Sequence, residues 1–600
     1  MKSTIWKYSK RILLVGFIGL SIFLINLIWF RPFFIGHFYD KIFFEFALEN
    51  PQMLTNIGVK YRYGELNDNS IAANEASFEL LKKDYQQLKE YEREGLEGQE
   101  LLSYDILDWF LKDQMDAHKY RYNGYSVTQR GGSYQGIINF MVNMHRVEDS
   151  SDAEDYVSRI SQIGSYFDNT LESVKQEQEH GVVPPDFIIS KVLENLHNIR
   201  DPELNENVLV KDFNKKVDAL SDLSEEEKSQ LKAQMLAQME AVVQPAYDRY
   251  IQFFENLKDD ANSNAGVWKF PNGAEYYQHR IRSVTTTDYT AEELHQLGLV
   301  EVDRIVAEME AILESQGYSG KSVGQIMNEL GEDPKFLYPD TDEGREQILA
   351  DYRAMITEVE AGMDKVFDIM PKSGVEVKRV PEYREKTAAG GSYQGPSIDG
   401  SRPGIFFANL YDIKATPKFS MRTLAYHEAI PGHHFQIAIK TELEGLPMFR
   451  NFIGFTSYSE GWALYAERLA WEQGYQQEPF SDLGRLQAEL MRAVRLVVDT
   501  GIHHKRWTRE QAIDYMASTT GLAMTDVESE IERYIVWPGQ ALAYKVGMLK
   551  ILELREKAEK ALGDKYDIRK FHNVVLKSGA VPMTILERMV DDYIARDGEV

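Results

Sequence analysis

The sequence predicts a mainly α-helical protein of two lobes that carries a small antiparallel β-sheet. Helix-start signals recur along the 600 residues and are followed by apolar residues at helical spacing, whereas strand signals are few and short. The length exceeds what one compact core usually holds, which favours two lobes. We expect a helical N-terminal lobe over residues 31–350 and a second lobe over residues 351–600.

The helix starts are defined by capping boxes, in which a Ser or Thr and a Glu or Gln three residues later satisfy each other's backbone amides. The pairs are Ser224 with Glu227, Thr290 with Glu293, and Thr508 with Gln511. After Thr290, apolar residues continue at helical spacing until Gly317, which predicts the end of that helix.

Three short segments predict strands, because β-branched and aromatic residues lie between Gly, Pro and Thr. They are Glu275–Val284, Val375–Val380 and Gly404–Leu410. The hexapeptide GGSYQG occurs at residues 131–136 and again at 390–395. Nothing around the two copies repeats, so we interpret them as unrelated Gly-rich loops and not as a duplication.

Composition excludes several classes of function. The formal net charge of −27, from 67 basic and 94 acidic residues, argues against nucleic acid as a partner, since a phosphate backbone selects clustered cations. The chain contains no cysteine, which excludes disulfides, thiolate catalysis and Cys-ligated metals. Any metal site must therefore use His and carboxylates.

The N-terminus predicts a membrane anchor. Four basic residues within positions 1–11 precede an apolar run over residues 12–30, and nineteen helical residues span roughly 28 Å, close to a bilayer core. Residues 1–11 should stay cytoplasmic and the body should be exported to the periplasm or cell surface. A cleaved signal peptide is the alternative, but the run is long and lacks a small-x-small cleavage site.

The segment with the clearest chemistry begins at Thr416-Pro417, a predicted helix start, and continues to His427-Glu428-Ala-Ile-Pro-Gly-His433-His434. In a common zinc-peptidase motif two His lie four residues apart on one helical face, with a Glu between them as general base. Here a Pro-Gly pair lengthens the spacing and must open the helix. A local bulge could return a later imidazole to the face of His427.

Two imidazoles compete to be the second ligand. In an undistorted helix His434 would lie at nearly the same angle as His427 but about 10.5 Å along the axis, too far to share one ion. If two residues loop out, His433 takes the fourth position. This geometry favours His433, with His434 as the alternative.

A third ligand is expected from a nearby helix. Glu460 and Glu467 are seven residues apart and share one face of a predicted apolar helix. A carboxylate on such a face needs a partner, and zinc would be one. We assign Glu460 as ligand and Glu467 as the group that supports the ligands; pairing of both with Arg residues such as Arg468 is the alternative.

Further groups could stabilise an oxyanion or bind substrate. His503 and His504 precede the Thr508 cap, and Tyr544 follows a Pro-Gly turn, so each is a candidate oxyanion donor, with a surface or core role as the alternative.

Substrate could also meet the segment before the zinc helix. Gly404–Leu410 could act as an edge strand that pairs with a peptide main chain. Asn409 could orient a substrate amide, and Tyr393 and Arg402, on the Gly-rich loop that precedes the strand, could close over the cleft.

Five segments together resemble the bacterial family catalogued as domain of unknown function 885. They are HEAIPGHH (427–434), SEGWALYAE (459–467), VDTGIH (498–503), PGQALAYKVG (538–547) and FHNVVLKSGAVP (571–582). That family is similar to the helical glutamate-zincins, which include thimet oligopeptidase and angiotensin-converting enzyme. The resemblance implies a two-lobed, zinc-peptidase-like helical fold around a deep channel, with one zinc ion held by two His and one Glu. The Pro-Gly insertion departs from the usual spacing and leaves the second His ligand open.

These observations predict an exported, membrane-anchored zinc peptidase in which Glu428 takes a proton from a zinc-bound water and passes it to the leaving amine. Its expected partners are a peptide substrate and, through the N-terminal helix, the membrane. The alternatives are a zinc amidohydrolase or esterase acting on non-peptide envelope material, and a tethered peptide-binding protein with a vestigial site. Glu428 argues against the last, because a binding protein has no need of a general base.

Overall fold

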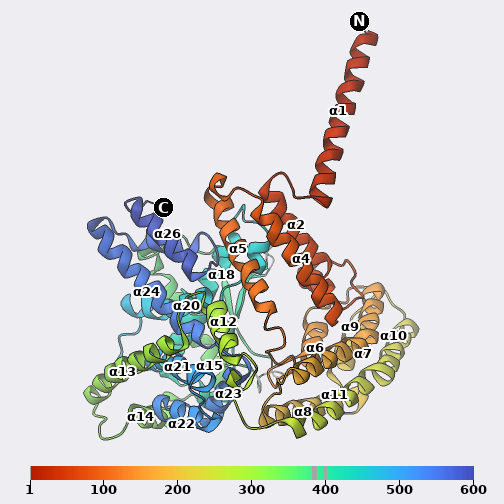
Figure 1. Cartoon of the computed structure of the whole chain (residues 1–600). Coiled ribbons are helices and arrows are strands. Elements are labelled where there is room, and N and C mark those ends of the chain that lie inside the picture. Colours follow the sequence, from red (N-terminus) through yellow and green to blue (C-terminus); the bar gives the residue numbers. More distant parts are fainter. Residues whose placement is uncertain (1, 382–384, 386–387, 398–399, 401, 600) are drawn as a thin grey trace. The chain divides into compact units, whose positions relative to one another are not determined.

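A computed structural model describes residues 2–381, 385, 388–397, 400 and 402–599, with side chains from Leu13 onward except Trp29. The chain is mainly helical, as expected (Figure 1). It divides into two compact units, Met1–Ser263 with Pro447–Phe452, and Asn264–Leu446 with Ile453–Val600. The expected boundary near residue 350 falls inside the second unit.

The first unit is built from helices around a hydrophobic core of aliphatic and aromatic side chains. Within it the 30-residue helix α7 packs against α10 and α11, where the rings of Phe167 and Tyr250 lie 4.8 Å apart. The Ser224 capping box begins α10, as predicted. The helices are α1 (Lys2–Trp29), α2 (Ile35–Leu48), α3 (Pro51–Asn56), α4 (Ile71–Lys89), α5 (Gly98–His118), α6 (Ser133–Asn143), α7 (Ser150–Glu179), α8 (Asp186–Arg200), α9 (Val208–Asp218), α10 (Glu225–Gln238), α11 (Gln244–Leu257) and α19 (Phe449–Phe452).

The apolar N-terminal run forms helix α1, and its large apolar side chains from Leu13 to Ile28 are mostly exposed. The expected anchor over residues 12–30 includes Ile12 and Trp29, whose side chains lie outside the described residues. Within the described part of the chain, no helix is both long and apolar enough to cross a membrane.

The second unit contains the sheet and the predicted zinc-binding segments. Helix α13 packs along α21, and α20 along α24. The last pair approaches closely because Gly461 meets Gly547, whose carbonyl carbon would lie 2.4 Å from a Cβ on Gly461. The helices are α12 (Gly273–Thr285), α13 (Ala291–Ser315), α14 (Val323–Glu332), α15 (Asp342–Glu360), α17 (Met421–Glu428), α18 (His433–Glu442), α20 (Thr456–Glu472), α21 (Pro479–His503), α22 (Arg509–Thr520), α23 (Met524–Val536), α24 (Leu542–Leu562), α25 (Ile568–Leu576) and α26 (Met583–Ala595).

The sheet has three described strands in the order β1-β3-β2, formed by Val375–Arg379, Gly404–Ala408 and Gly391–Gln394 respectively. Two of the three predicted strands are therefore confirmed. The sheet is mixed and not purely antiparallel as expected, because β1 runs parallel to β3 while β2 runs antiparallel to it.

The third predicted strand, Glu275–Val284, is wrong: this segment lies in helix α12. Its buried residues Tyr277, Ile281 and Val284 recur at intervals of four and three. That is helical spacing, and it prevails over the preference of the individual residues for strands.

The predicted capping boxes and helix end in the second unit are confirmed. The capping boxes of Thr290 and Thr508 begin α13 and α22, and Gly317 follows the end of α13 with φ of +85°. The two copies of GGSYQG have different structures, since one leads into helix α6 and the other forms strand β2.

Candidate metal centre

The helix breaks immediately after His427 and Glu428. The predicted helix start at Thr416-Pro417 is wrong: these residues lead into a short 3-10 turn, and helix α17 begins at Met421. This helix ends at Glu428, and a new helix, α18, starts at His433. The expected bulge within one helix is thus a complete break. Gly432 permits it, because a Cβ there would lie only 2.0 Å from the carbonyl oxygen of His427. The turn is also held by Trp462, whose Nε1 donates to the carbonyl of Pro431 over 2.9 Å.

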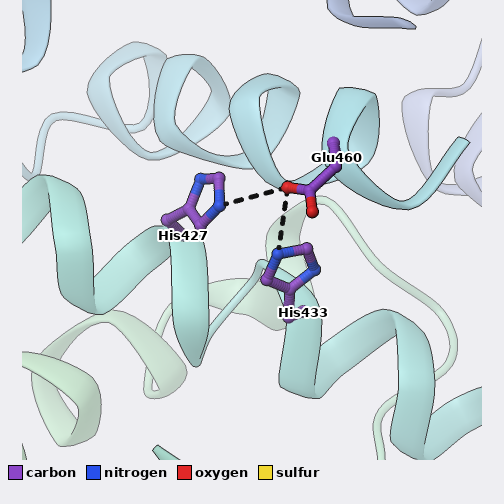
Figure 2. A group of neighbouring side chains, drawn as sticks. All are labelled: His427, His433 and Glu460. Carbon is purple, nitrogen blue, oxygen red and sulfur yellow. Dashed lines mark ion pairs between the residues drawn. The ribbon is translucent and has the colours of Figure 1, made fainter. Parts of the chain in front are cut away.

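This break brings His433 beside His427, with ring centroids 4.8 Å apart. Helix α20 presents Glu460 to both rings (Figure 2). The Oε2 atom of Glu460 lies 3.6 Å from Nε2 of His427 and 3.4 Å from Nε2 of His433. One ligand atom from each residue falls within 4.8 Å of the others.

The geometry of these three residues fits a zinc ion. Bonds of about 2.0–2.1 Å in a tetrahedral site separate neighbouring ligand atoms by roughly 3.3 Å, close to the two distances above. Two imidazoles and one carboxylate are a donor set of catalytic zinc sites. In addition, Oε2 of Glu460 is buried and accepts no hydrogen bond from any described residue. His427, His433 and Glu460 could therefore hold the metal.

Glu467, two turns after Glu460 on the same face of α20, is hydrogen-bonded to Nδ1 of His427, the ring nitrogen that points away from Glu460. Its Oε1 lies 2.7 Å from Nδ1 of His427, and both side chains are buried. This contact directs Nε2 of His427 towards Glu460. Burial alone would lower the pKa of His427, but Glu460 and Glu467 outweigh it and raise the pKa to about 9. Pairing with His433 and His427 overcomes burial at Glu460 and keeps its pKa well below the usual range.

Glu428 is a buried carboxyl group directly after His427. Burial raises its pKa, and Glu460 adds to the rise, while the positive charges of His427, His433 and Arg492 oppose it. A carboxylate with a raised pKa is a stronger base than an exposed one, which suits proton transfer near neutral pH.

His434 does not join the cluster. It is buried, and its Nδ1 lies 2.9 Å from the hydroxyl of Tyr393 on β2. Burial lowers the pKa of His434 to about 4. The contact joins α18 to the sheet, and it occupies the Tyr393 hydroxyl that was expected to close over a substrate.

The expected oxyanion donors have structural partners. His503 is buried, its Nδ1 accepts from the backbone amide of Val267, and its Nε2 donates to the carbonyl of Tyr534, so neither nitrogen remains for a substrate. His504 lies 3.4 Å from Glu292 at the surface. Tyr544 is half-buried on α24, with the guanidinium of Arg495 4.4 Å from its ring centre.

The expected substrate-binding residues instead hold the loops around the sheet. The side-chain amide of Asn409 donates to the carbonyls of Glu385 and Ala388. Arg402 donates to the carbonyls of Gly395 and Pro403. Strand β3 is also central, so the expectation that it offers a free edge is wrong: β1 and β2 occupy both of its sides.

Contacts between distant segments give several residues of the family-specific segments a structural role. Asp499 on α21 is buried and accepts from the hydroxyl of Tyr277 and from the amide of Gly539. Tyr465 on α20 contacts His572 on α25 through a 2.7 Å hydrogen bond. The SEGWALYAE, VDTGIH, PGQALAYKVG and FHNVV segments thus support the helices around the candidate metal centre. No signal in the neighbouring sequence indicated these pairings.

Comparison with known proteins identifies relatives along nearly the whole chain. A crystal structure of a "putative lipoprotein" from Colwellia psychrerythraea is 37% identical, covers 94% of this chain and 98% of its own, and superposes with a TM-score of 0.89. A "putative lipoprotein of unknown function" from Shewanella oneidensis is 20% identical, with coverages of 92% and 98% and a TM-score of 0.73, and shows the same fold.

A "putative oligoendopeptidase F" from Bacillus anthracis str. Ames is 14% identical over 86% of this chain and 95% of its own, but its TM-score of 0.31 carries no argument. Curated proteins provide no match. The family described as "Bacterial protein of unknown function (DUF885)" matches residues 51–590. The chain therefore belongs to this bacterial family.

Proposed function

We propose that the protein is a zinc-dependent peptidase of the cell envelope. The observation that carries the proposal is the cluster of His427, His433 and Glu460, with ligand atoms at the spacing of a tetrahedral zinc site beside the buried Glu428. A purely structural metal site would gain nothing from a buried carboxylate next to its ligands, because an uncompensated buried charge is costly.

In the proposed mechanism the residues of the chain bind the metal and move the proton. When bound, zinc supplies a Lewis acid that polarises a substrate carbonyl and makes water more acidic. Glu428 accepts the proton of the attacking water on its carboxylate and returns it to the leaving amine nitrogen. Glu467 keeps Nε2 of His427 directed at the site throughout, through its bond to Nδ1.

A peptide substrate could pair with β2 and not with β3. Strand β2 lies at one end of the described sheet and contacts α17 and α18, which carry the metal-binding residues. Main-chain hydrogen bonds at a strand edge recognise any extended peptide. The alternative is a zinc amidohydrolase or esterase acting on non-peptide envelope material, which would use the same metal and base.

We also propose that the first unit attaches the protein to a membrane. The two relatives with solved structures are described as lipoproteins, but this chain has no cysteine for lipid attachment. It has instead the exposed apolar side chains of α1, and more exposed aromatic side chains lie in and next to α2, among them Phe33, Phe34, Phe44 and Phe46. Such surfaces bind the lipid interface by burial of apolar area.

The test combines metal analysis with a peptide-library digest read by mass spectrometry. Purified protein should carry about one zinc per chain and cleave peptides. Glu428→Gln should keep the metal but lose turnover about 10²–10⁴-fold, because an amide cannot accept the proton. Undiminished turnover in Glu428→Gln would refute the mechanism. Hydrolysis of esters or envelope amides without any peptide cleavage would favour the alternative.

A further inference from the structure

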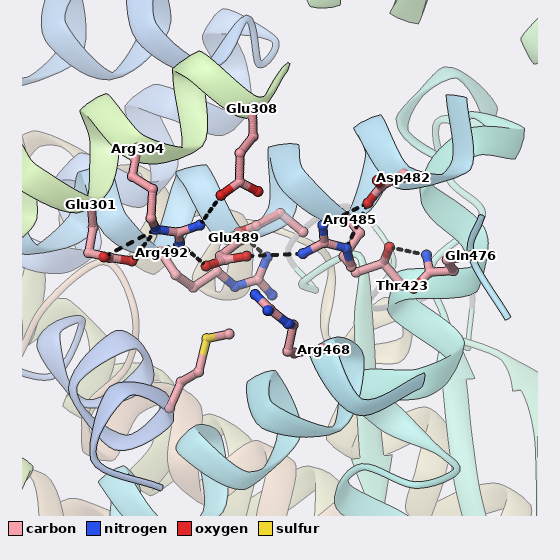
Figure 3. Close-up of polar contacts among 12 residues, drawn as sticks. Glu301, Arg304, Glu308, Thr423, Arg468, Gln476, Asp482, Arg485, Glu489 and Arg492 are labelled. Atoms are coloured by element: carbon pink, nitrogen blue, oxygen red, sulfur yellow. Dashed lines mark hydrogen bonds and ion pairs between the residues drawn. The ribbon is translucent and has the colours of Figure 1, made fainter. Parts of the chain in front are cut away.

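The buried charges on the early part of helix α21 are paired (Figure 3). Arg485 lies 2.7 Å from Asp482 and 3.2 Å from Glu489. Glu489 is also in contact with Arg304 and lies 2.7 Å from the buried amine of Lys545. Each of these cations therefore has a carboxylate partner, as buried charges require.

Arg492, two turns after Arg485 on the same helix, is different. It is half-buried, and no carboxylate among the described residues lies within ion-pair distance of it. Its Nη1 donates only to the carbonyl of Ala488 in its own helix, over 3.2 Å, and to the sulfur of Met491. Its Nε is buried without an acceptor in the described part of the chain. A buried guanidinium donor without an acceptor is costly, which favours a ligand that supplies one.

The packing of α17 against α21 places Arg492 near Glu428. Helix α21 contacts both α17 and the 3-10 turn Lys418–Ser420 before it, and at Gly484 a Cβ would lie 2.0 Å from the carbonyl oxygen of Phe419 in that turn. From this point Glu428 is nine residues along one segment and Arg492 eight along the other, a rise of roughly 12–14 Å along each segment. Arg492 is accordingly one of the positive charges that oppose the burial-induced rise in the pKa of Glu428.

The next turn of α21 adds to the positive charge. Arg495 is buried and shares the single carboxylate of Glu530 with Arg533, each at 2.9 Å. Nη1 of Arg495 and Nε of Arg533 are buried and lack acceptors among the described residues. Two arginines thus share one carboxylate here. This surplus contrasts with the paired charges around Arg485.

We propose that Arg492 binds a carboxylate group of the substrate beside Glu428. The inference rests on the proposed peptidase function and narrows its substrates to peptides with an anionic group close to the cleaved bond. A planar guanidinium with unused donors matches a carboxylate, to which it can donate two parallel hydrogen bonds. The carboxylate is either the free C-terminus of a peptide or the side chain of an Asp or Glu.

The experiment measures peptide binding directly, on the full-length, zinc-loaded Glu428→Gln protein. Three probes are used: acetyl-Ala-Ala-Phe-Ala-Ala with a free carboxylate, the same peptide as its amide, and the amide with Glu in place of the last Ala. Arg492→Gln is introduced as the test variant and Arg492→Lys as the conservative one. Arg569→Gln, which removes an exposed arginine paired with Asp567, is the matched control.

We expect at least one acidic probe to bind more tightly than the neutral amide. Arg492→Gln should weaken that probe about 10–100-fold and the neutral amide little, since a hydrogen bond to a charged group is lost only in the first case. Arg492→Lys should retain part of the difference in affinity between the acidic and the neutral probe. The control Arg569→Gln should bind all three probes as the parent protein does. Which acidic probe responds distinguishes the C-terminus from a side chain.

Two results separate this inference from the proposed function. Equal affinity for acidic and neutral probes, or an equal loss for both in Arg492→Gln with an unchanged melting temperature, would overturn the role of Arg492. Wild-type protein that cleaves both kinds of peptide equally would do the same while leaving the peptidase proposal intact. Binding of acidic probes that depends on Arg492, without cleavage of any peptide, would instead refute the peptidase proposal alone.

Discussion

Replacement of Glu467 by Gln tests how the centre holds its first imidazole. The Oε1 atom of Glu467 lies 2.7 Å from Nδ1 of His427, and both side chains are buried. A hydrogen bond to a charged group contributes about 1.5–3 kcal/mol and one between neutral groups about 0.5–1.5 kcal/mol. Glu467→Gln should therefore weaken this hydrogen bond by about 1–1.5 kcal/mol, which corresponds to a roughly tenfold lower affinity for zinc. The lower basicity of Nε2 adds to this loss, so we expect a total of about 10–100-fold.

The assay is competition for zinc against a chelator of known affinity, together with the thermal unfolding of each variant. Glu472→Gln is the matched control, because Glu472 lies on the same helix α20 but pairs with Arg468 and Arg555. The control should bind zinc like the wild type. Unchanged zinc affinity in folded Glu467→Gln would refute the positioning role, and equal loss in both variants would point to a general effect on α20.

Three further predictions concern the turn, the second ligand and the pH dependence of stability. His433→Ala should abolish zinc binding and His434→Ala should retain it; metal analysis showing the reverse would contradict the geometry. Gly432→Ala should lower the free energy of unfolding, measured with urea, by about 3 kcal/mol, because the added Cβ would overlap the carbonyl oxygen of His427. A variant as stable as the wild type would disprove the tight turn. Burial lowers the pKa of His503 to about 4 and of His572 to about 3, both from 6.5, so the unfolded chain takes up these protons first. As the pH falls below about 6.5, each of these two histidines should lower the free energy of unfolding by about 1.4 kcal/mol per pH unit. A free energy of unfolding that stays constant down to about pH 5.5 would exclude this effect.

The features that depend on neighbouring residues could be predicted from the sequence. The capping boxes at Thr290 and Thr508 each form within four residues, and both begin helices. The cluster residues were also recognisable, since His427 and His433 are six apart and no cysteine could replace them. Glu460 was chosen from one helical face for its need of a partner, and it lies between the two imidazoles.

Other features depend on which distant segments meet, and local sequence does not carry that information. The same six residues, GGSYQG, lead into helix α6 at one place and form strand β2 at the other. Strand β3 was recognised as a strand, but its central position depends on β1 and β2. Likewise, the local sequence around His503 allows a position in a cleft. In the structure both ring nitrogens of His503 are hydrogen-bonded to the backbone, to the amide of Val267 and to the carbonyl of Tyr534.

The sequence by itself determined that the chain is mainly helical, where the capping boxes begin helices, and two of the three strands it predicted. It also singled out the residues proposed to bind a metal, because these features follow from spacing and side-chain chemistry over a few turns. The tertiary structure alone decided the path through Gly432, a complete break between two helices, which places the favoured His433 beside His427 and turns His434 towards Tyr393. It alone revealed Arg492, whose significance lies in a missing carboxylate partner among the described residues. Whether a charge is paired depends on side chains far away in sequence, so only the packing of the helices could decide it.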